Sequence, residues 1–162
     1  MFDNGRLVGI YTCGSAGAAM VSCDDAELRL REGVAGDRYA TKAGTWRDPS
    51  QSSDVTLFAE ESLAPALESG IDLRVNEVRR NLITRGLDLN ELIGKTFRVG
   101  SAVLHGDREC APCGYLETIT EHPGLRDALK GRGGLRATIL TGGTVRVGDT
   151  ISVVDDVAAG AG

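Results

Sequence analysis

Long apolar runs, aromatic residues and an excess of basic charge are all missing from this sequence. No stretch of the chain approaches the roughly 20 consecutive apolar residues that a membrane-spanning helix needs. Aromatic residues make up 4% of the chain and the formal net charge is −5, whereas nucleic-acid-binding proteins carry stacking groups and a positive excess. We therefore predict that the protein binds neither a membrane nor nucleic acid. Residues 7–21 are apolar but interrupted by polar side chains, so we expect no export signal and a cytoplasmic location.

Cysteine is scarce too, with four in a chain of 162 residues, which is long enough to bury a core without disulfides. We expect these thiols to be reduced and to serve chemistry or packing. The length fits one domain. In this interpretation residues 1–24 form an N-terminal strand and a loop of small residues within that domain, residues 25–154 form its main body, and residues 155–162 are a flexible tail.

Proline is also rare, and 22 glycines separate short runs rich in β-forming residues. This pattern predicts a mainly β fold, a barrel or a sandwich, with many tight turns. Pro65 falls inside the first expected helix, which must therefore begin late or be kinked. The expected helices are residues 60–68, 87–92 and 125–130, the expected strands are residues 6–12, 26–31, 55–58, 78–84 and 135–140, and hairpins are expected at residues 96–104 and 144–152.

Cys110 and Cys113 are the first candidates for chemistry, because two thiols this close in sequence can share an oxidant, a metal or a transferred sulfur. Arg108 lies just before them, and its positive charge would favour the thiolate. A zinc site would need a second ligand pair at similar spacing, and a thioredoxin-like motif would need a strand–helix–strand setting; the sequence offers neither. Packing of both thiols beneath a loop remains an open alternative. His122 has no nucleophile beside it in sequence and is expected at the surface.

A second group of candidates could bind an anion. In an extended strand the side chains of Arg79 and Arg80 would point in opposite directions, and an inward guanidinium can hold a phosphate or a carboxylate through two hydrogen bonds. Consecutive amides in the glycine-rich residues 131–134 could form an anion-binding nest. The alternatives are solvated arginines on an edge strand and ordinary polar turns. The candidate residues are Arg38, Arg79, Arg80, Asn81, Arg132 and Gly133.

These motifs follow one another in an order that resembles the MOSC domain family. MOSC domains are found at the C-terminus of molybdenum cofactor sulfurases and in small stand-alone bacterial proteins. The resemblance covers residues 25–154. It is carried, in order along the chain, by Gly36-Asp37-Arg38, residues 55–58 with the glutamates that follow them, Arg80-Asn81-Leu82, Gly86-Leu87-Asp88-Leu89, Gly94, Cys110-Ala111-Pro112-Cys113, Gly131-Arg132-Gly133-Gly134 and Val147-Gly148-Asp149.

The resemblance implies a MOSC-like β-barrel with a few short helices, and a pocket where a molybdopterin-type cofactor or a sulfur species is handled beside a cysteine. Cys113 matches the family cysteine, with Cys110 as a second thiol, and Cys113 would be the metal ligand if molybdenum is bound. By the same resemblance Arg80 and Asn81, with Arg38 from another loop, would hold the phosphate or the pterin. The family is also associated with pyridoxal phosphate, but the pyridoxal-phosphate module of the full sulfurases has no counterpart here, so we expect no site for that cofactor.

Three functions are compatible with this resemblance. The first is a sulfur carrier or transferase, in which a cysteine desulfurase loads a persulfide onto Cys113, Cys110 acts as the resolving thiol and a molybdenum enzyme accepts the sulfur. The second is a molybdenum-cofactor-dependent reductase of N-hydroxylated compounds, which would need an electron-transfer protein as its partner. The third is a non-catalytic cofactor-binding module whose cysteines are structural. The first uses both cysteines and is the leading hypothesis; the oligomeric state stays open.

Overall fold

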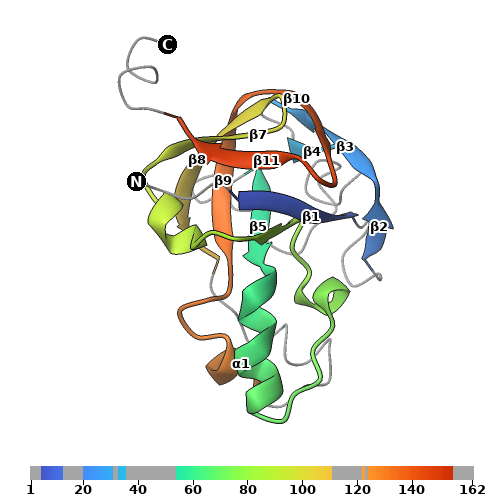
Figure 1. Cartoon of the computed structure of the whole chain (residues 1–162), viewed down its shortest axis with the longest axis vertical. Coiled ribbons are helices and arrows are strands. Elements are labelled where there is room, and N and C mark those ends of the chain that lie inside the picture. The colour runs from blue at the N-terminus through green and yellow to red at the C-terminus, as the bar shows by residue number, and fades with distance from the viewer. Residues whose placement is uncertain are drawn as a thin grey trace.

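Strands dominate the computed structural model, which describes residues 5–12, 20–30, 33–35, 54–110, 122 and 124–154 (Figure 1). The strands are β1 (Gly5–Thr12), β2 (Val21–Cys23), β3 (Asp25–Arg29), β4 (Gly33–Val34), β5 (Val55–Ala59), β6 (Leu82–Arg85), β7 (Thr96–Val99), β8 (Ala102–Glu109), β9 (Leu135–Thr141), β10 (Gly143–Arg146) and β11 (Thr150–Val153). The α-helices are α1 (Leu63–Glu68) and α3 (Leu125–Ala128), and the 3₁₀ helices are η1 (Glu60–Ser62), η2 (Val75–Val78) and η3 (Leu89–Leu92).

The main sheet closes on itself. Its strands are hydrogen-bonded in the order β11-β7-β8-β9-β5-β6-β1-β2, and β1 also pairs with β11. Seven of these strands therefore form a closed ring, and β2 lies outside it along β1. Among the described strand pairs only β5 and β6 run parallel. Closure leaves the ring without free edges, and the predicted mainly β barrel is confirmed.

A second sheet contains β10, β3 and β4, in that order, and packs onto the barrel. Its inward side chains Leu28, Val34 and Val145 belong to the same buried cluster as the barrel interior. The hairpin predicted at residues 144–152 is wrong, because β10 pairs with β3 whereas β11 pairs with β7 and β1. The alternating pattern predicts a strand on either side of the turn, but it does not predict which other strand each of them pairs with. The hairpin predicted at residues 96–104 is confirmed by the β7–β8 pairing.

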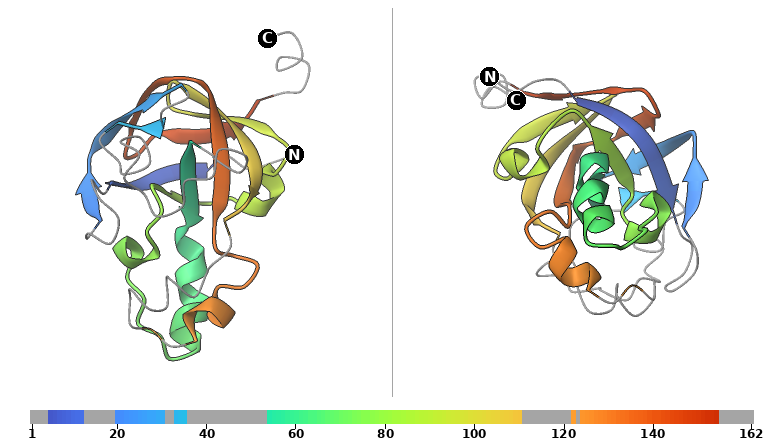
Figure 2. Two further views of the ribbon diagram at one scale, coloured as in Figure 1. Left: turned by 180° about the vertical axis from the view of Figure 1, so that it is seen from behind. Right: turned by 60° about the horizontal axis from the view of Figure 1, so that its bottom comes forward.

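Two buried clusters hold the fold together. In β8 every second residue from Ala102 to Gly106 is buried and those between are partly exposed, which is the alternation expected when one face of a strand lines a core. α1 and α3 lie together at the lower end of the molecule in Figure 1 and in the left view of Figure 2, and a second buried cluster that includes Phe58, Leu125 and Leu129 joins them to the sheet. Each large apolar side chain buried there contributes about 1.5–3 kcal/mol, so this cluster is what fixes the helices to the sheet.

The strand predicted at residues 78–84 begins later than its pattern suggests. Val78 ends η2, and Arg79 has a left-handed backbone conformation with φ of 60°, so the strand starts only at Leu82. The expectation that Arg79 and Arg80 alternate along a strand is therefore wrong. Val78 is the last residue of the 3₁₀ helix η2, and its side chain is buried in the second cluster. In the sequence, a buried apolar residue at the end of such a helix cannot be distinguished from the first residue of a strand.

The predicted helices are present in shorter form. Residues 60–68 form η1 followed by α1, and Pro65 is the third residue of α1, where its missing N–H removes no intrahelical bond.

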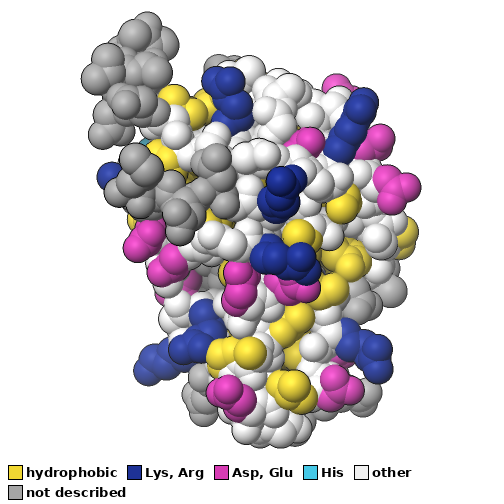
Figure 3. Space-filling model, viewed as in Figure 1, with side chains coloured by type: hydrophobic (Ala, Val, Ile, Leu, Met, Phe, Trp, Pro, Cys, Tyr) yellow, Lys and Arg dark blue, Asp and Glu magenta, His cyan; other side chains and the backbone are white. Residues whose placement is uncertain are grey.

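No helix among the described residues is long and apolar enough to cross a bilayer. On the face shown in Figure 3, basic and acidic side chains are interspersed.

Candidate functional site

The side chain of Arg80 joins three segments that the sequence motifs single out. Its Nε donates to the carbonyl of Gly133 at 3.0 Å, its Nη1 to that of Val78 at 3.2 Å and its Nη2 to that of Cys110 at 3.2 Å. The guanidinium is partly buried. The end of β8, the glycine elbow (residues 131–134) and the segment before β6 therefore meet at one residue, which we call the Arg80 junction.

Gly134 allows the glycine elbow to approach this junction. Its φ is 122°, and a Cβ at this position would collide with the carbonyl oxygen of Leu57 and lie 3.3 Å from Nε of Arg80. The carbonyl of Gly134 in turn accepts a hydrogen bond from the amide of Cys110 at 2.8 Å. A glycine-rich sequence that suggested an anion-binding nest thus also has a packing role, which the motif alone does not reveal.

Asn81 is buried, and its side chain connects three strands. Its Oδ1 accepts hydrogen bonds from the amide of Thr56 at 3.2 Å and from the Thr56 hydroxyl at 3.1 Å, and its Nδ2 donates to the carbonyl of Tyr11 at 3.2 Å. Backbone hydrogen bonds from Tyr11 to Asn81 and from Asn81 to Thr56 reinforce the connection. Asn81 therefore fixes the start of β6 between β1 and β5, and its predicted contact with a cofactor stays a prediction.

Arg79 is the non-glycine residue with positive φ among the described residues, with φ 60° and ψ 39°. A side chain in this conformation costs about 1–2 kcal/mol relative to the right-handed region. Such strain persists where surrounding structure imposes it, and it is concentrated at functional sites. The strain sits directly before the Arg80 junction, so it supports Arg79 as a functional candidate.

The two candidate cysteines differ in what the structure describes. Cys110 is a free thiol at the end of β8 and is 2% exposed. A thiol this buried can react only with a group that its own chain brings to it, or after a local opening. Cys113 and Arg38 lie outside the described residues, and their predicted roles stay predictions.

The motifs of the sequence do not indicate the contact between the side chains of His122 and Glu77. Nε2 of His122 lies 3.2–3.3 Å from the carboxylate oxygens of Glu77, and the two side chains are only 23% and 26% exposed. Glu77 also accepts a hydrogen bond from the amide of Arg74 at 2.9 Å. The expected surface position of His122 is therefore wrong. The partners are 45 residues apart, so no local motif could have indicated the pair.

Two consecutive glutamates fasten η1 to the end of β6. The carboxylate of Glu60 accepts a hydrogen bond from Nε of Arg85 at 2.8 Å, and that of Glu61 accepts one from the amide of Gly86 at 2.7 Å. The hydrogen bond and negative charge of Glu60 raise the pKa of Arg85 above its ordinary value. These two contacts position one wall of a pocket.

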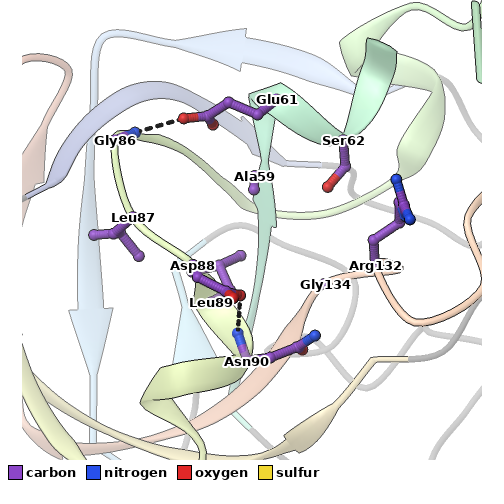
Figure 4. Close-up of a pocket in the computed structure, with 10 residues that line it drawn as sticks. All are labelled: Ala59, Glu61, Ser62, Gly86, Leu87, Asp88, Leu89, Asn90, Arg132 and Gly134. Atoms are coloured by element: carbon purple, nitrogen blue, oxygen red, sulfur yellow. Dashed lines mark hydrogen bonds between the residues drawn. The ribbon is translucent and has the colours of Figure 1, made fainter. Parts of the chain in front are cut away.

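That pocket has a volume of about 520 Å³ and lies between η1, the loop after β6 and the glycine elbow (Figure 4). Arg132 and Gly134 of the elbow line it. The amide of Arg132 donates to the carbonyl of Leu129 at 2.9 Å, so this amide is not available to an anion, whereas the Arg132 side chain is exposed at the pocket. Of the predicted anion-binding residues, Arg80 and Gly133 are in direct contact, and Arg132 faces a separate space.

Family membership follows from the sequence as a whole. The profile of the MOSC domain matches residues 44–152. The chain belongs to the MOSC domain family. MOSC domains are generally associated with the molybdenum cofactor, so a role related to that cofactor follows in general terms. No curated protein matches the sequence.

Solved structures reproduce the fold of this MOSC domain. The YuaD protein from Bacillus subtilis has a TM-score of 0.76 at 19% identity, over 94% of this chain and 98% of that one. YiiM from Escherichia coli has a TM-score of 0.71 at 19% identity, over 93% of this chain and 70% of that one. YiiM from Geobacillus stearothermophilus has a TM-score of 0.71 at 14% identity, over 93% and 75% of the two chains. At these identities the similarity concerns the fold.

In the described part of the MOSC domain, Arg80 offers donors that suit the anionic portion of a molybdenum cofactor. A guanidinium has five N–H donors, and Arg80 engages three of them with carbonyls. The remaining two could hold a phosphate. Within the described ranges no group of three or more His, Cys, Asp or Glu side chains is arranged to hold a metal ion.

Proposed function

We propose that this MOSC domain carries sulfur as a persulfide on Cys113 for the assembly of a metal–sulfur cofactor. The observation that supports the proposal is the Arg80 junction, which anchors the chain at Cys110 through its carbonyl and its amide. Cys113 follows this anchored point three residues later in the sequence. Transfer of sulfur between two proteins benefits from an anchored segment of this kind, because a sulfur atom attached to it meets its partner in a defined geometry.

Loading of the carrier needs no oxidant. The thiolate of Cys113 attacks the outer sulfur of a persulfide presented by a cysteine desulfurase. The sulfur–sulfur bond of the donor breaks, the thiolate of the desulfurase leaves, and the outer sulfur with its proton is now bonded to Cys113. One sulfur–sulfur bond is exchanged for another, so the step is redox-neutral.

Release of the sulfur uses the second thiol. The thiolate of Cys110 attacks the inner sulfur of the Cys113 persulfide, the persulfide bond breaks and hydrosulfide leaves toward the acceptor, a molybdenum enzyme in this proposal. The outer sulfur gains two electrons and the two thiols lose them as they form a disulfide, which a cellular dithiol must then reduce. Because Cys110 is 2% exposed, this step requires that its own chain brings the Cys113 persulfide to it or that the site opens locally.

The same proposal assigns the cofactor-holding residues. When bound, the molybdenum cofactor supplies a metal centre that takes a sulfur ligand. The two free N–H groups of Arg80 would bind its phosphate, and Arg79, whose strained backbone directly precedes Arg80, is proposed as a second contact. The residues proposed to hold it are Arg38, Arg79, Arg80, Asn81 and Gly133, whereas Arg132 faces the separate pocket.

The test is intact-mass measurement after incubation with a cysteine desulfurase and cysteine. We expect the mass to increase by one sulfur atom in the unmodified protein and not in Cys113→Ser. Cys110→Ser should load normally but release no hydrosulfide without added thiol. Cys23→Ser is the matched control, because Cys23 is a free, partly buried thiol on β2, and it should load and release normally.

Loading of the Cys113→Ser variant would refute the carrier. Molybdenum and pterin analysis of the freshly purified protein gives an independent check. Stoichiometric molybdenum in a protein whose Cys113 cannot be loaded would favour the reductase instead, and full ligand binding by a variant lacking both cysteines would favour the non-catalytic module.

A further inference from the structure

The pocket of about 520 Å³ beside the glycine elbow has two chemically different walls (Figure 4). Its size lies within the range of small-molecule sites. Leu89 is buried and Leu87 partly buried, and both contribute apolar surface to the lining. The polar residues of the lining include Glu61, Ser62, Asp88 and Arg132, and their hydrogen bonds show which atoms are left for a ligand.

One wall presents hydrogen-bond acceptors with negative charge. Glu61 uses Oε2 to accept from the amide of Gly86 at 2.7 Å, and Asp88 uses Oδ1 to accept from the amide of Asn90 at 3.0 Å. Each carboxylate is thereby oriented by a backbone amide and keeps its other oxygen. Both residues are exposed, so these oxygens are accessible to a ligand.

The other wall presents donors. Ser62 and Arg132 lie on the same side of the pocket in Figure 4, and both line it. Among the described residues, no side chain pairs with the guanidinium of Arg132, and the hydroxyl of Ser62 makes no capping bond at the start of α1. This wall therefore offers a guanidinium and a hydroxyl to an anionic group, a combination that suits a carboxylate or a phosphate.

We propose that this pocket binds a small zwitterion, whose carboxylate or phosphate meets Arg132 and Ser62 and whose ammonium group meets Glu61 and Asp88. A polyanion such as a nucleoside triphosphate is disfavoured, because the two carboxylates outnumber the single arginine of the lining. An uncharged ligand would leave the oriented carboxylates and the guanidinium unpaired. This inference holds whether or not Cys113 carries sulfur.

The experiment is an NMR titration of backbone amides with ω-amino acids of increasing length, namely β-alanine, γ-aminobutyrate and ε-aminocaproate. Caproate and hexylamine each keep one of the two charges and serve as matched ligands. We expect one of the zwitterions to shift the amides of Gly86 and Asn90 and to bind about threefold or more tightly than either singly charged ligand, since two partly exposed ion pairs add modestly.

Variants separate the two walls. Arg132→Gln should weaken the zwitterion and caproate by about threefold and leave hexylamine unchanged, whereas Asp88→Asn should weaken the zwitterion and hexylamine and leave caproate unchanged. Asparagine keeps the oxygen that accepts from Asn90, so the loop stays in place. Arg98→Gln, at an exposed position on β7, is the control and should change nothing.

Three results would overturn the proposal. They are the absence of shifts at the pocket amides with every zwitterion, equal affinity for a zwitterion and a singly charged ligand, and tighter binding of inorganic phosphate than of any zwitterion. The last result would identify Arg132 as part of a simple anion site. Because none of these measurements involves Cys113 or a sulfur donor, failure here leaves the carrier proposal standing and failure of the carrier leaves this site standing.

Discussion

Replacement of Arg80 by lysine tests whether the Arg80 junction holds three segments together. Lysine keeps the positive charge but has a single nitrogen, so it can reach at most one of the three carbonyls that Arg80 contacts at 3.0–3.2 Å. At least two of the three carbonyls are therefore left without the donor that Arg80 provides. The change therefore isolates the geometry of the guanidinium from its charge.

The expected loss follows from the number of hydrogen bonds. A buried bond from a charged donor contributes about 1.5–3 kcal/mol, but this side chain is partly exposed and water can replace part of each bond, so about 1 kcal/mol per bond is appropriate. Two lost bonds give a decrease of about 2 kcal/mol in the free energy of unfolding. For a chain of this length that corresponds to a melting temperature lower by about 4–8 °C.

Urea unfolding followed by circular dichroism measures the free energy, and an unchanged slope would show that the same surface is exposed on unfolding. Hydrogen exchange at the amide of Cys110 gives a local readout, because that amide bonds to Gly134 beside the junction and should exchange faster in the variant. Arg98→Lys on the exposed face of β7 is the control. A stability of Arg80→Lys within about 0.5 kcal/mol of the unmodified protein, with unchanged exchange at Cys110, would refute the reasoning.

Three further predictions concern single positions. Thr84→Val should raise the free energy of unfolding by about 1 kcal/mol in urea titrations, because the Thr84 hydroxyl is buried and has no hydrogen-bond partner among the described residues; a destabilised variant would contradict this. At Arg79 both small variants lose the guanidinium, but Arg79→Gly should be about 1 kcal/mol more stable than Arg79→Ala because glycine tolerates φ of 60°; equal melting curves would argue against strain there. Gly106→Ala should lower stability by about 1–3 kcal/mol, since its Cβ would collide with the carbonyl of Leu92, and calorimetry showing no change would mean that the loop yields freely.

The strands of the barrel could be predicted from sequence because their signal is local. Alternation of buried and exposed residues in β8 needs only the residues of β8 itself. The pairing of strands cannot be predicted in this way, because it depends on distant residues. β1 closes the ring by placing Gly5 opposite Ile151, near the end of the described chain, and the sequence of neither strand indicates the other as its partner. The same limit explains why the second predicted hairpin is wrong, since β10 and β11 join different sheets across one turn.

The site could be predicted only as a set of motifs. The sequence marks the segments around Arg80, Cys110 and Gly133 because each combines glycine, arginine or cysteine in an unusual way. It could not show that they touch, since the acceptors of Arg80 are backbone carbonyls and any residue would provide those. The prediction that Arg79 lies in a strand is also wrong, for a local reason: the left-handed backbone of this one residue interrupts a pattern that otherwise fits an extended chain.

These contacts change how an inactive Arg80 variant must be interpreted. Three of its five donors already serve the fold, so a defect in an Arg80 variant would follow either from a missing phosphate contact or from a displaced anchor at Cys110. The lysine variant separates these causes, because it keeps a charge for a phosphate but not the three-way junction. Loss of both stability and loading would assign Arg80 to positioning, since a phosphate contact alone would survive in lysine. Loss of stability with normal sulfur loading would instead mean that Cys113 accepts sulfur without the anchored segment at Cys110. The carrier proposal would then need another supporting observation.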